Sequence, residues 1–126
     1  MVLAKVLVVD DAKIMRMTIK NMLSTLGHTV IGEADNGYDA TKEFKRLKPD
    51  LITLDITMPN VNNLADGLEA LKEIIAFDSD AKVIMITSIG EEKKVIEAIS
   101  LGASNYILKP LLLDKLEQAI NKTLNK

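Results

Sequence analysis

The stretch AKVLVVDD, residues 4–11, joins a short apolar run to two adjacent carboxylates. Its apolar part, Ala4–Val9, is a nearly continuous run of Val and Leu, as is typical of a strand whose two faces are both buried. A secretory signal would begin with basic residues and end at small ones, whereas this run leads directly into Asp10 and Asp11. We therefore interpret the run as a buried strand that ends in carboxylates, and we expect a cytoplasmic protein.

Similar runs recur along the chain. They are His28–Ala34, Leu51–Leu54, Lys82–Thr87 and Asn105–Leu108. The stretches between them carry apolar residues at helical spacing, for example over 12–26 and 112–124. Strands that alternate with helices form a parallel sheet that is covered on both faces and connected by right-handed crossovers. The pattern predicts an α/β fold of five strand–helix units, in which residues 1–126 form one domain.

The composition agrees with one globular domain. Of the 126 residues, 48% are hydrophobic and 27% are charged, which excludes a disordered chain. The chain has no cysteine and one histidine, so disulfides, thiolate metal sites and multi-histidine metal sites are excluded. A net charge of −2 disfavours nucleic acid, and no segment approaches the ~18 apolar residues of a membrane span. We expect neither a nucleic-acid partner nor a membrane.

Polar residues lie at the ends of all five predicted strands, but Asp35-Asn36 after the second strand is ordinary turn chemistry, which leaves four strand ends with candidate site residues. These residues are Asp10-Asp11, Asp55, Thr87-Ser88 and Lys109-Pro110. Ligands of open α/β sheets bind outside the carboxyl ends of the strands, where these residues would meet. Each signal is weak alone, since chance predicts roughly 0.8 Asp-Asp pairs in a chain of this composition. The specificity lies in the combination.

These residue types suit phosphoryl transfer. Three close carboxylates repel one another unless a cation neutralises them, and Mg²⁺ prefers such oxygen ligands. An aspartate can accept a phosphoryl group covalently, so Asp55 is the predicted nucleophile. Lys109 would add positive charge and Thr87 a hydroxyl donor for the phosphoryl oxygens. An acyl phosphate on Asp55 would attract both groups more strongly than a carboxylate does, which is the physical basis for a switch.

The combined motif resembles the bacterial response-regulator receiver domain over essentially the full length of the chain. Its most specific parts are Asp10-Asp11, Asp55 with Met58-Pro59 after it, Thr87-Ser88 and Lys109-Pro110. The resemblance implies a three-layer, flavodoxin-like doubly wound fold with strand order 2-1-3-4-5 and five helices. It also implies that a histidine kinase phosphorylates Asp55, with Mg²⁺ as the cofactor.

The resemblance assigns roles to further residues. The Mg²⁺ ligands would be Asp11 directly, Asp10 through water, Asp55, and the backbone carbonyl of Thr57. The phosphoryl-binding and switch residues would be Thr87, Ser88, Lys109 and Tyr106. Tyr106 would turn inward when Thr87 moves toward the phosphoryl group. The bond before Pro110 is expected to be cis.

Two features depart from the family pattern. Pro59 and Gly67 are four residues further apart than is common in receivers. We favour an extra turn at the start of the third helix, capped by Asn62 or Asn63, over a lengthened loop. Added bulk beside Asp55 would then slow the exchange of water or partners at the site. Leu111 stands where many receivers have Phe, which we interpret as a conservative core substitution.

The expected function is that of a stand-alone, CheY-like receiver, a phosphorylation-controlled binding module and not an enzyme beyond its own phosphorylation and slow dephosphorylation. We expect a monomer whose target binds the face formed by the fourth helix, fifth strand and fifth helix, with the flagellar motor switch in chemotaxis as the candidate target. An alternative is a phosphorelay intermediate that passes the phosphoryl group to a histidine phosphotransferase. An aspartate-nucleophile phosphatase is less favoured because Asp55-Ile56-Thr57 lacks the second acid. A flavodoxin-like electron carrier is less favoured because no Ser/Thr/Gly-rich loop follows the first strand.

Several other residues have plain structural interpretations. We expect Met15, Met17 and Met22 to lie in the core and His28 to have no chemical role. Asp11 can cap the first helix and bind the metal as well. The run Glu91–Lys94 is interpreted as a solvated helix start that borders the target face.

Overall fold

The computed structural model describes residues 3–58 and 66–124. Strands and helices alternate along the chain, as predicted. In order, they are β1 (Lys5–Val9), α1 (Lys13–Thr25), β2 (Thr29–Ala34), α2 (Gly37–Leu47), β3 (Leu51–Asp55), α3 (Gly67–Phe77), β4 (Val83–Thr87), α4 (Glu92–Leu101), β5 (Asn105–Leu108) and α5 (Leu113–Leu124). The strands pair in parallel in the order β2-β1-β3-β4-β5, which confirms the expected doubly wound sheet.

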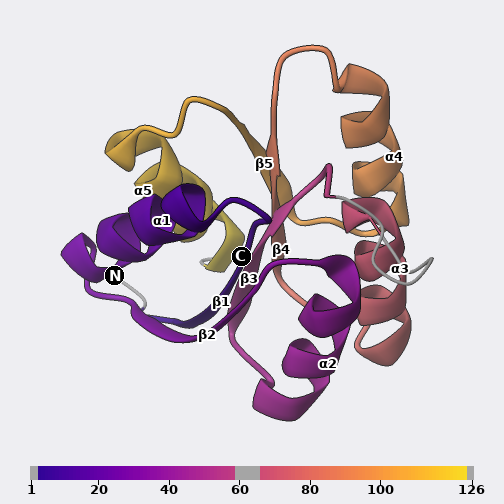
Figure 1. Ribbon diagram of the computed structural model, residues 1–126, viewed down its shortest axis with the longest axis horizontal. Coiled ribbons are helices and arrows are strands. Elements are labelled where there is room, and N and C mark those ends of the chain that lie inside the picture. The colour runs from indigo at the N-terminus through magenta and orange to yellow at the C-terminus, as the bar shows by residue number, and fades with distance from the viewer. Residues whose placement is uncertain (1–2, 59–65, 125–126) are drawn as a thin grey trace.

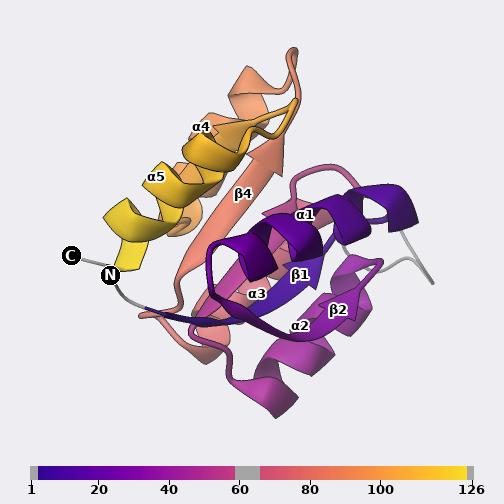
Figure 2. The ribbon, with the colours of Figure 1, turned by 90° about the vertical axis from the view of Figure 1, so that its left-hand side faces the viewer.

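Helices cover both faces of the sheet (Figure 1). Helices α1 and α5 lie on one face and α2, α3 and α4 on the other, which a quarter turn of the molecule shows from the side of α1 and α5 (Figure 2). Strand β1 shows how the sequence divides the core. Val6 and Val8 pack with α1 and α5, while Leu7 and Val9 pack under α2 and α3. The continuous apolar run is therefore buried on both faces, as predicted.

The helix ends correct several expectations. Ala12, not Asp11, is the N-cap of α1, and its side chain makes no capping bond. The N-cap of α3 is Asp66, whose carboxylate accepts a hydrogen bond from the Glu69 N–H at 3.1 Å. The prediction that Asn62 or Asn63 caps this helix is therefore wrong, because a side chain caps only the backbone N–H groups within its own first turn. The predicted extra turn over 61–64 lies outside the described residues.

The core is mostly as expected, with one exception. Met15 and Met22 pack against the α1–α5 side of the core, but Met17 is half exposed. Leu111 is buried in the same cluster, which agrees with its interpretation as a core residue. Within the described residues, no helix is both long enough and apolar enough to cross a bilayer.

Candidate functional site

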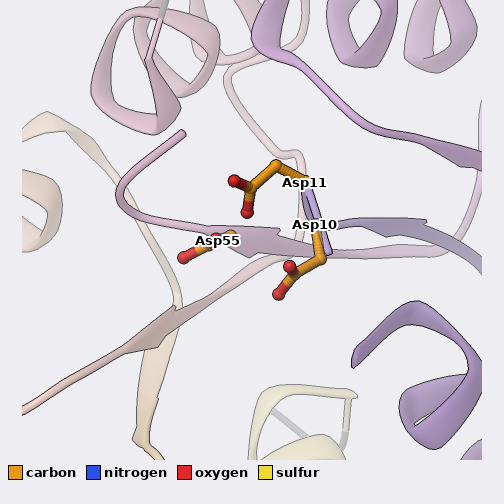
Figure 3. A group of neighbouring side chains, drawn as sticks. All are labelled: Asp10, Asp11 and Asp55. Atoms are coloured by element: carbon orange, nitrogen blue, oxygen red, sulfur yellow. The ribbon is translucent and has the colours of Figure 1, made fainter. Parts of the chain in front are cut away.

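Three carboxylates meet at the carboxyl edge of the sheet. Asp10 and Asp11 follow β1, and Asp55 is the last residue of β3, the neighbouring strand. One oxygen from each carboxylate lies within 4.8 Å of the others (Figure 3). Asp10 and Asp55 are buried, whereas Asp11 is exposed. Residues 45 positions apart in the chain therefore form one acidic cluster, because parallel strands end at the same edge.

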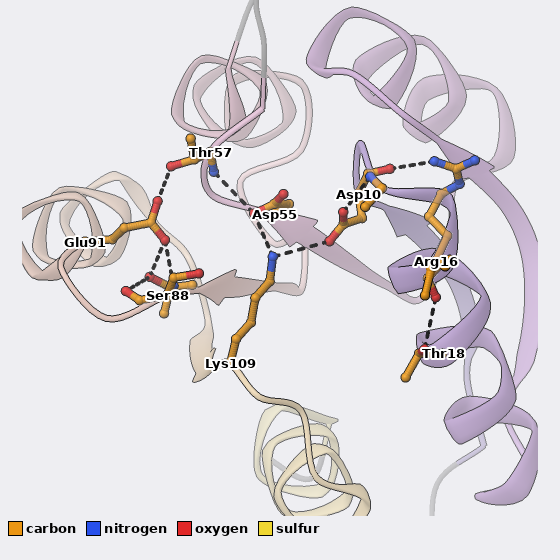
Figure 4. Close-up of polar contacts among 11 residues, drawn as sticks. Asp10, Arg16, Thr18, Asp55, Thr57, Ser88, Glu91 and Lys109 are labelled. Carbon is orange, nitrogen blue, oxygen red and sulfur yellow. Dashed lines mark hydrogen bonds and ion pairs between the residues drawn. The ribbon is translucent and has the colours of Figure 1, made fainter.

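Lys109 is the cation of this cluster. Its Nζ lies 3.7 Å from Asp10 Oδ2 and 3.7 Å from Asp55 Oδ1 (Figure 4). It follows β5, and its peptide bond to Pro110 is cis. One ammonium placed between two buried carboxylates neutralises half of their charge. The cluster therefore keeps a net negative charge, which a bound cation would neutralise.

This uncompensated negative charge contributes to a raised pKa of Asp55. Burial and the neighbouring charge of Asp10 raise the pKa from 3.8 to about 7, against the opposing effects of Lys109 and of the hydrogen bond from the Thr57 N–H. The pKa of Asp10 is raised as well, by burial first, although the Ala12 N–H and Lys109 both act to lower it. A bound cation would remove this repulsion.

The donor set fits a hard divalent cation. Among residues 3–58 and 66–124, the ligand atoms of the cluster are all carboxylate oxygens, and carboxylates together with backbone carbonyls are the ligands that Mg²⁺ takes in proteins. Asp10 Oδ2 is buried and has no hydrogen-bond partner among the described residues. A buried carboxylate oxygen without a donor is costly, so a ligand at this position has a physical reason to bind.

Arg16, which sequence reasoning missed, fixes the backbone of the cluster. Its Nη1 donates to the carbonyl oxygen of Asp10 at 2.8 Å, and its Nε donates to the Glu33 carboxylate at 2.9 Å. The side chain therefore ties the end of β1 to β2. Its position in the first turn of the predicted helix, a few residues after Asp10-Asp11, is the only sequence signal for this role.

Thr87 and Ser88 lie beside this cluster but bond elsewhere. The Thr87 hydroxyl is 3.2 Å from Glu91 Oε1 and 3.4 Å from the Ser88 carbonyl oxygen. The Ser88 N–H donates to the same Glu91 Oε1 at 2.6 Å. On its other side, the Glu91 carboxylate accepts from the hydroxyl of Thr57, to which the Lys94 ammonium also donates.

Glu91 is thus a site residue that the sequence did not reveal. The prediction of a solvated helix start is wrong for this residue, which is half-buried and bridges the loops after β3 and β4. Burial by itself would raise the pKa of Glu91, but the hydrogen bonds from Thr57, the Ser88 N–H and Thr87, with the charge of Lys94, lower it overall. A glutamate four residues after a strand end carries no sign of which way it points.

Tyr106 lies on β5 and is 49% exposed. Two hollows meet at its side chain. One, of about 260 Å³, lies toward α4 and includes Thr87, Val95 and Leu108. The other, of about 500 Å³, lies toward α5 and includes Leu112, Lys115 and Lys122. Tyr106 therefore lines both a hollow that it shares with Thr87 and a hollow that apolar residues and lysines line together.

Most of the chain matches the model of a known family. The sequence profile of the family described as "Response regulator receiver domain" matches residues 6–121. The chain is 47% identical over 121 residues to "Chemotaxis protein CheY" of Bacillus subtilis, which covers 96% of this chain and 98% of that protein. It is 45% identical over 118 residues to the protein of the same name from Thermotoga maritima, covering 94% and 95%.

Solved structures agree with the sequence comparisons. CheY in a CheX–CheY–BeF₃–Mg²⁺ complex from Borrelia burgdorferi superposes with a TM-score of 0.89 at 34% identity, covering 97% of this chain and 90% of that one. The response regulator domain of Thermotoga maritima CheB superposes with a TM-score of 0.86 at 36% identity, covering 99% and 98%.

Proposed function

Because the chain belongs to the response regulator receiver domain family and is of the CheY type, we propose that Asp55 accepts a phosphoryl group from a histidine kinase in the presence of Mg²⁺. One observation carries the proposal, which is that Asp55 lies buried between two other aspartates and an ammonium at one edge of the sheet. The pKa of Asp55 is raised because its surroundings disfavour the ionised carboxylate, and strongly shifted pKa values of this kind are typical of functional sites.

The phosphoryl transfer needs few groups from the protein. A carboxylate oxygen of Asp55 attacks the phosphorus of the kinase's phosphohistidine, the P–N bond breaks, and its electron pair returns to the imidazole nitrogen. Asp10, Asp11, Asp55 and the Thr57 carbonyl would hold Mg²⁺, which when bound supplies positive charge for the carboxylates and the phosphoryl oxygens. Lys109 ion-pairs with the developing charge. The signal ends by hydrolysis, in which water attacks the phosphorus, phosphate leaves and the Asp55 carboxylate is restored.

The phosphoryl group would be sensed at the next strand. A phosphoryl group has more oxygens to accept hydrogen bonds than a carboxylate, and Thr87 and Ser88 supply a hydroxyl and an N–H one strand away. Movement of Thr87 would alter the hollow that it lines with Tyr106 and thereby the face formed by α4, β5 and α5. We propose that this face binds the target. The names of the relatives favour a role in chemotaxis, and the flagellar motor switch is the target that we propose.

The test is phosphorylation by a small donor. With acetyl phosphate and Mg²⁺, mass spectrometry should find one base-labile phosphoryl group, located on Asp55, and Asp55→Asn should abolish it. Asp80→Asn is the control, because Asp80 is exposed and precedes β4 at the opposite edge of the sheet. Absence of the adduct, or its survival in Asp55→Asn, would contradict the proposal. Rapid transfer from Asp55 to a histidine phosphotransferase would instead favour the relay role.

A further inference from the structure

The Glu91 carboxylate holds two loops together at the edge of the site. It accepts hydrogen bonds from the hydroxyl of Thr57 after β3 and from the hydroxyl of Thr87 and the N–H of Ser88 at the end of β4. The Ser88 bond, at 2.6 Å, is short for an N–H donor, as charge-assisted bonds are. Glu91 is therefore held firmly at this place, although it precedes the first turn of α4 and belongs to neither strand.

Two of these three donors are the groups that a phosphoryl group on Asp55 would need. Thr87 and Ser88 are the residues to which the proposed function assigns the binding of phosphoryl oxygens. A carboxylate and a phosphoryl group both present negatively charged oxygens, so both are accepted by the same kind of donor. The Thr87 hydroxyl has one hydrogen and the Ser88 amide has one hydrogen, so neither can serve both anions at full strength.

We infer that Glu91 is an internal competitor, whose carboxylate occupies the phosphoryl-binding donors until phosphorylation of Asp55 displaces it. The inference rests on the proposed function. Release of Thr87 and Ser88 from Glu91 is then a required step of activation, and the free energy of those bonds is subtracted from the affinity of the site for a phosphoryl group. Thr57 holds the displaced Glu91 carboxylate close by, because the bond from its hydroxyl to Glu91 does not involve Thr87, and Lys94 donates to that same hydroxyl.

A plain structural role makes the opposite prediction. If Glu91 only braces the loops, its removal loosens Thr87 and Ser88 and weakens both the fold and the binding of an anion. If Glu91 competes, its removal weakens the fold slightly but strengthens anion binding. The two measurements therefore change in opposite directions only when Glu91 is a competitor.

The experiment measures the affinity for beryllofluoride, a mimic of the phosphoryl group, by ¹⁹F NMR titration at fixed Mg²⁺. Glu91→Gln keeps the size of the side chain and removes its charge, and Glu91→Ala removes the carboxyl altogether. We expect the half-saturating beryllofluoride concentration to fall about fivefold in Glu91→Ala and less in Glu91→Gln, because a charge-assisted bond no longer opposes binding. The melting temperature of the ligand-free variants should fall in parallel.

Glu92→Gln is the matched control. It removes the same charge one residue away, and the Glu92 carboxylate accepts from the Gly90 N–H instead of from Thr57, Thr87 or Ser88. Its affinity should stay within about twofold of the wild type, because exposed charges are screened. An unchanged or weaker affinity in both Glu91 variants, or an equal gain in Glu92→Gln, would overturn the inference. Failure of the wild type itself to bind beryllofluoride would instead overturn the proposed function.

Discussion

The two edges of the sheet treat their polar groups in opposite ways. At the amino edge, a side chain just before one strand accepts a hydrogen bond from an N–H at the start of its neighbour. His28 Nδ1 accepts from the Ala4 N–H, Asp50 from the Lys5 N–H, and Ser104 from the Val83 N–H, at 3.0, 2.9 and 3.2 Å. At the carboxyl edge, Asp10 Oδ2 is buried without a donor, and Asp55 sits in a field that favours its neutral form.

The amino edge of the sheet contributes to stability, whereas the carboxyl edge of the same sheet carries the candidate site. Satisfied N–H groups at the amino edge join adjacent strands, so that this edge stabilises the sheet by itself. The unpaired oxygen of Asp10 and the buried charge of Asp55 destabilise the ligand-free protein, and they persist because the rest of the structure holds them in place. Removing a polar side chain should therefore lower stability at the amino edge and raise it at the carboxyl edge.

The largest effect is expected from Gly67→Ala, which tests how rigidly the carboxyl edge is held. A Cβ at this position would lie 2.2 Å from the carbonyl oxygen of Asp55 and 2.8 Å from the Ile56 Cα, so that backbone would have to move. We expect the free energy of unfolding to fall by about 3 kcal/mol, measured by urea denaturation.

Gly32→Ala is the matched comparison within the sheet. Its Cβ would meet Leu47 Cδ1 at 2.6 Å, which is the end of a flexible side chain. We expect a loss of at most about 1 kcal/mol. Equal losses in the two variants would show that the backbone behind Asp55 is no more constrained than a side chain in the core.

His28→Ala sharpens the comparison from the amino edge. The variant leaves the buried Ala4 N–H without its acceptor, and we expect a loss of about 2 kcal/mol at pH 8 in chemical denaturation. Burial lowers the pKa of His28 from its ordinary 6.5, so its contribution is fully present above that value and is lost as the pH falls below it. The difference between wild type and variant should therefore shrink in acid. A difference that stays constant between pH 8 and pH 5 would contradict this account.

Asp55→Asn is the smallest effect and has the opposite sign. Because the pKa of Asp55 in the folded protein, about 7, lies above its ordinary 3.8, the folded state holds its proton more tightly than the unfolded chain does. The wild type should lose stability as the pH rises from about 4 to 7. Without Mg²⁺ at pH 8, Asp55→Asn should gain about 1 kcal/mol, measured by denaturant titration.

Asp50→Asn is the control for that change. It removes the same charge at the amino edge, where the carboxylate accepts from the Lys5 N–H, and it should not stabilise the protein. If both variants gain stability equally, the gain reflects net charge alone and the contrast between the edges disappears.

The sequence predicted the sheet and the acidic cluster well, and the reasons are physical. Strands buried on both faces have to be continuously apolar, and parallel strands bring their carboxyl ends together, so Asp10, Asp11 and Asp55 could be grouped without coordinates. Caps were harder, because Asn62, Asn63 and Asp66 are all capable N-caps and only the backbone path decides among them.

Side-chain direction was the second limit. Met17 lies two residues from Met15, which is more than half a helical turn, so the two cannot share a buried face. Glu91 and Arg16 were missed because both have long, flexible side chains, which reach the site from helix starts where the sequence does not show which way a charged residue points.

The two outer strands of the sheet affect how readily this protein aggregates. Strands β2 and β5 are the outer strands, and an outer strand with free N–H and C=O groups can recruit a strand from another molecule. Strand β5 is only four residues long, and β2 carries Glu33 in ion pairs with Arg16 and Lys20 of α1. The shortness of β5 and the paired charges of β2 both oppose the addition of strands from other copies of the protein. The protein can therefore reach a high concentration without forming fibrous aggregates through its sheet.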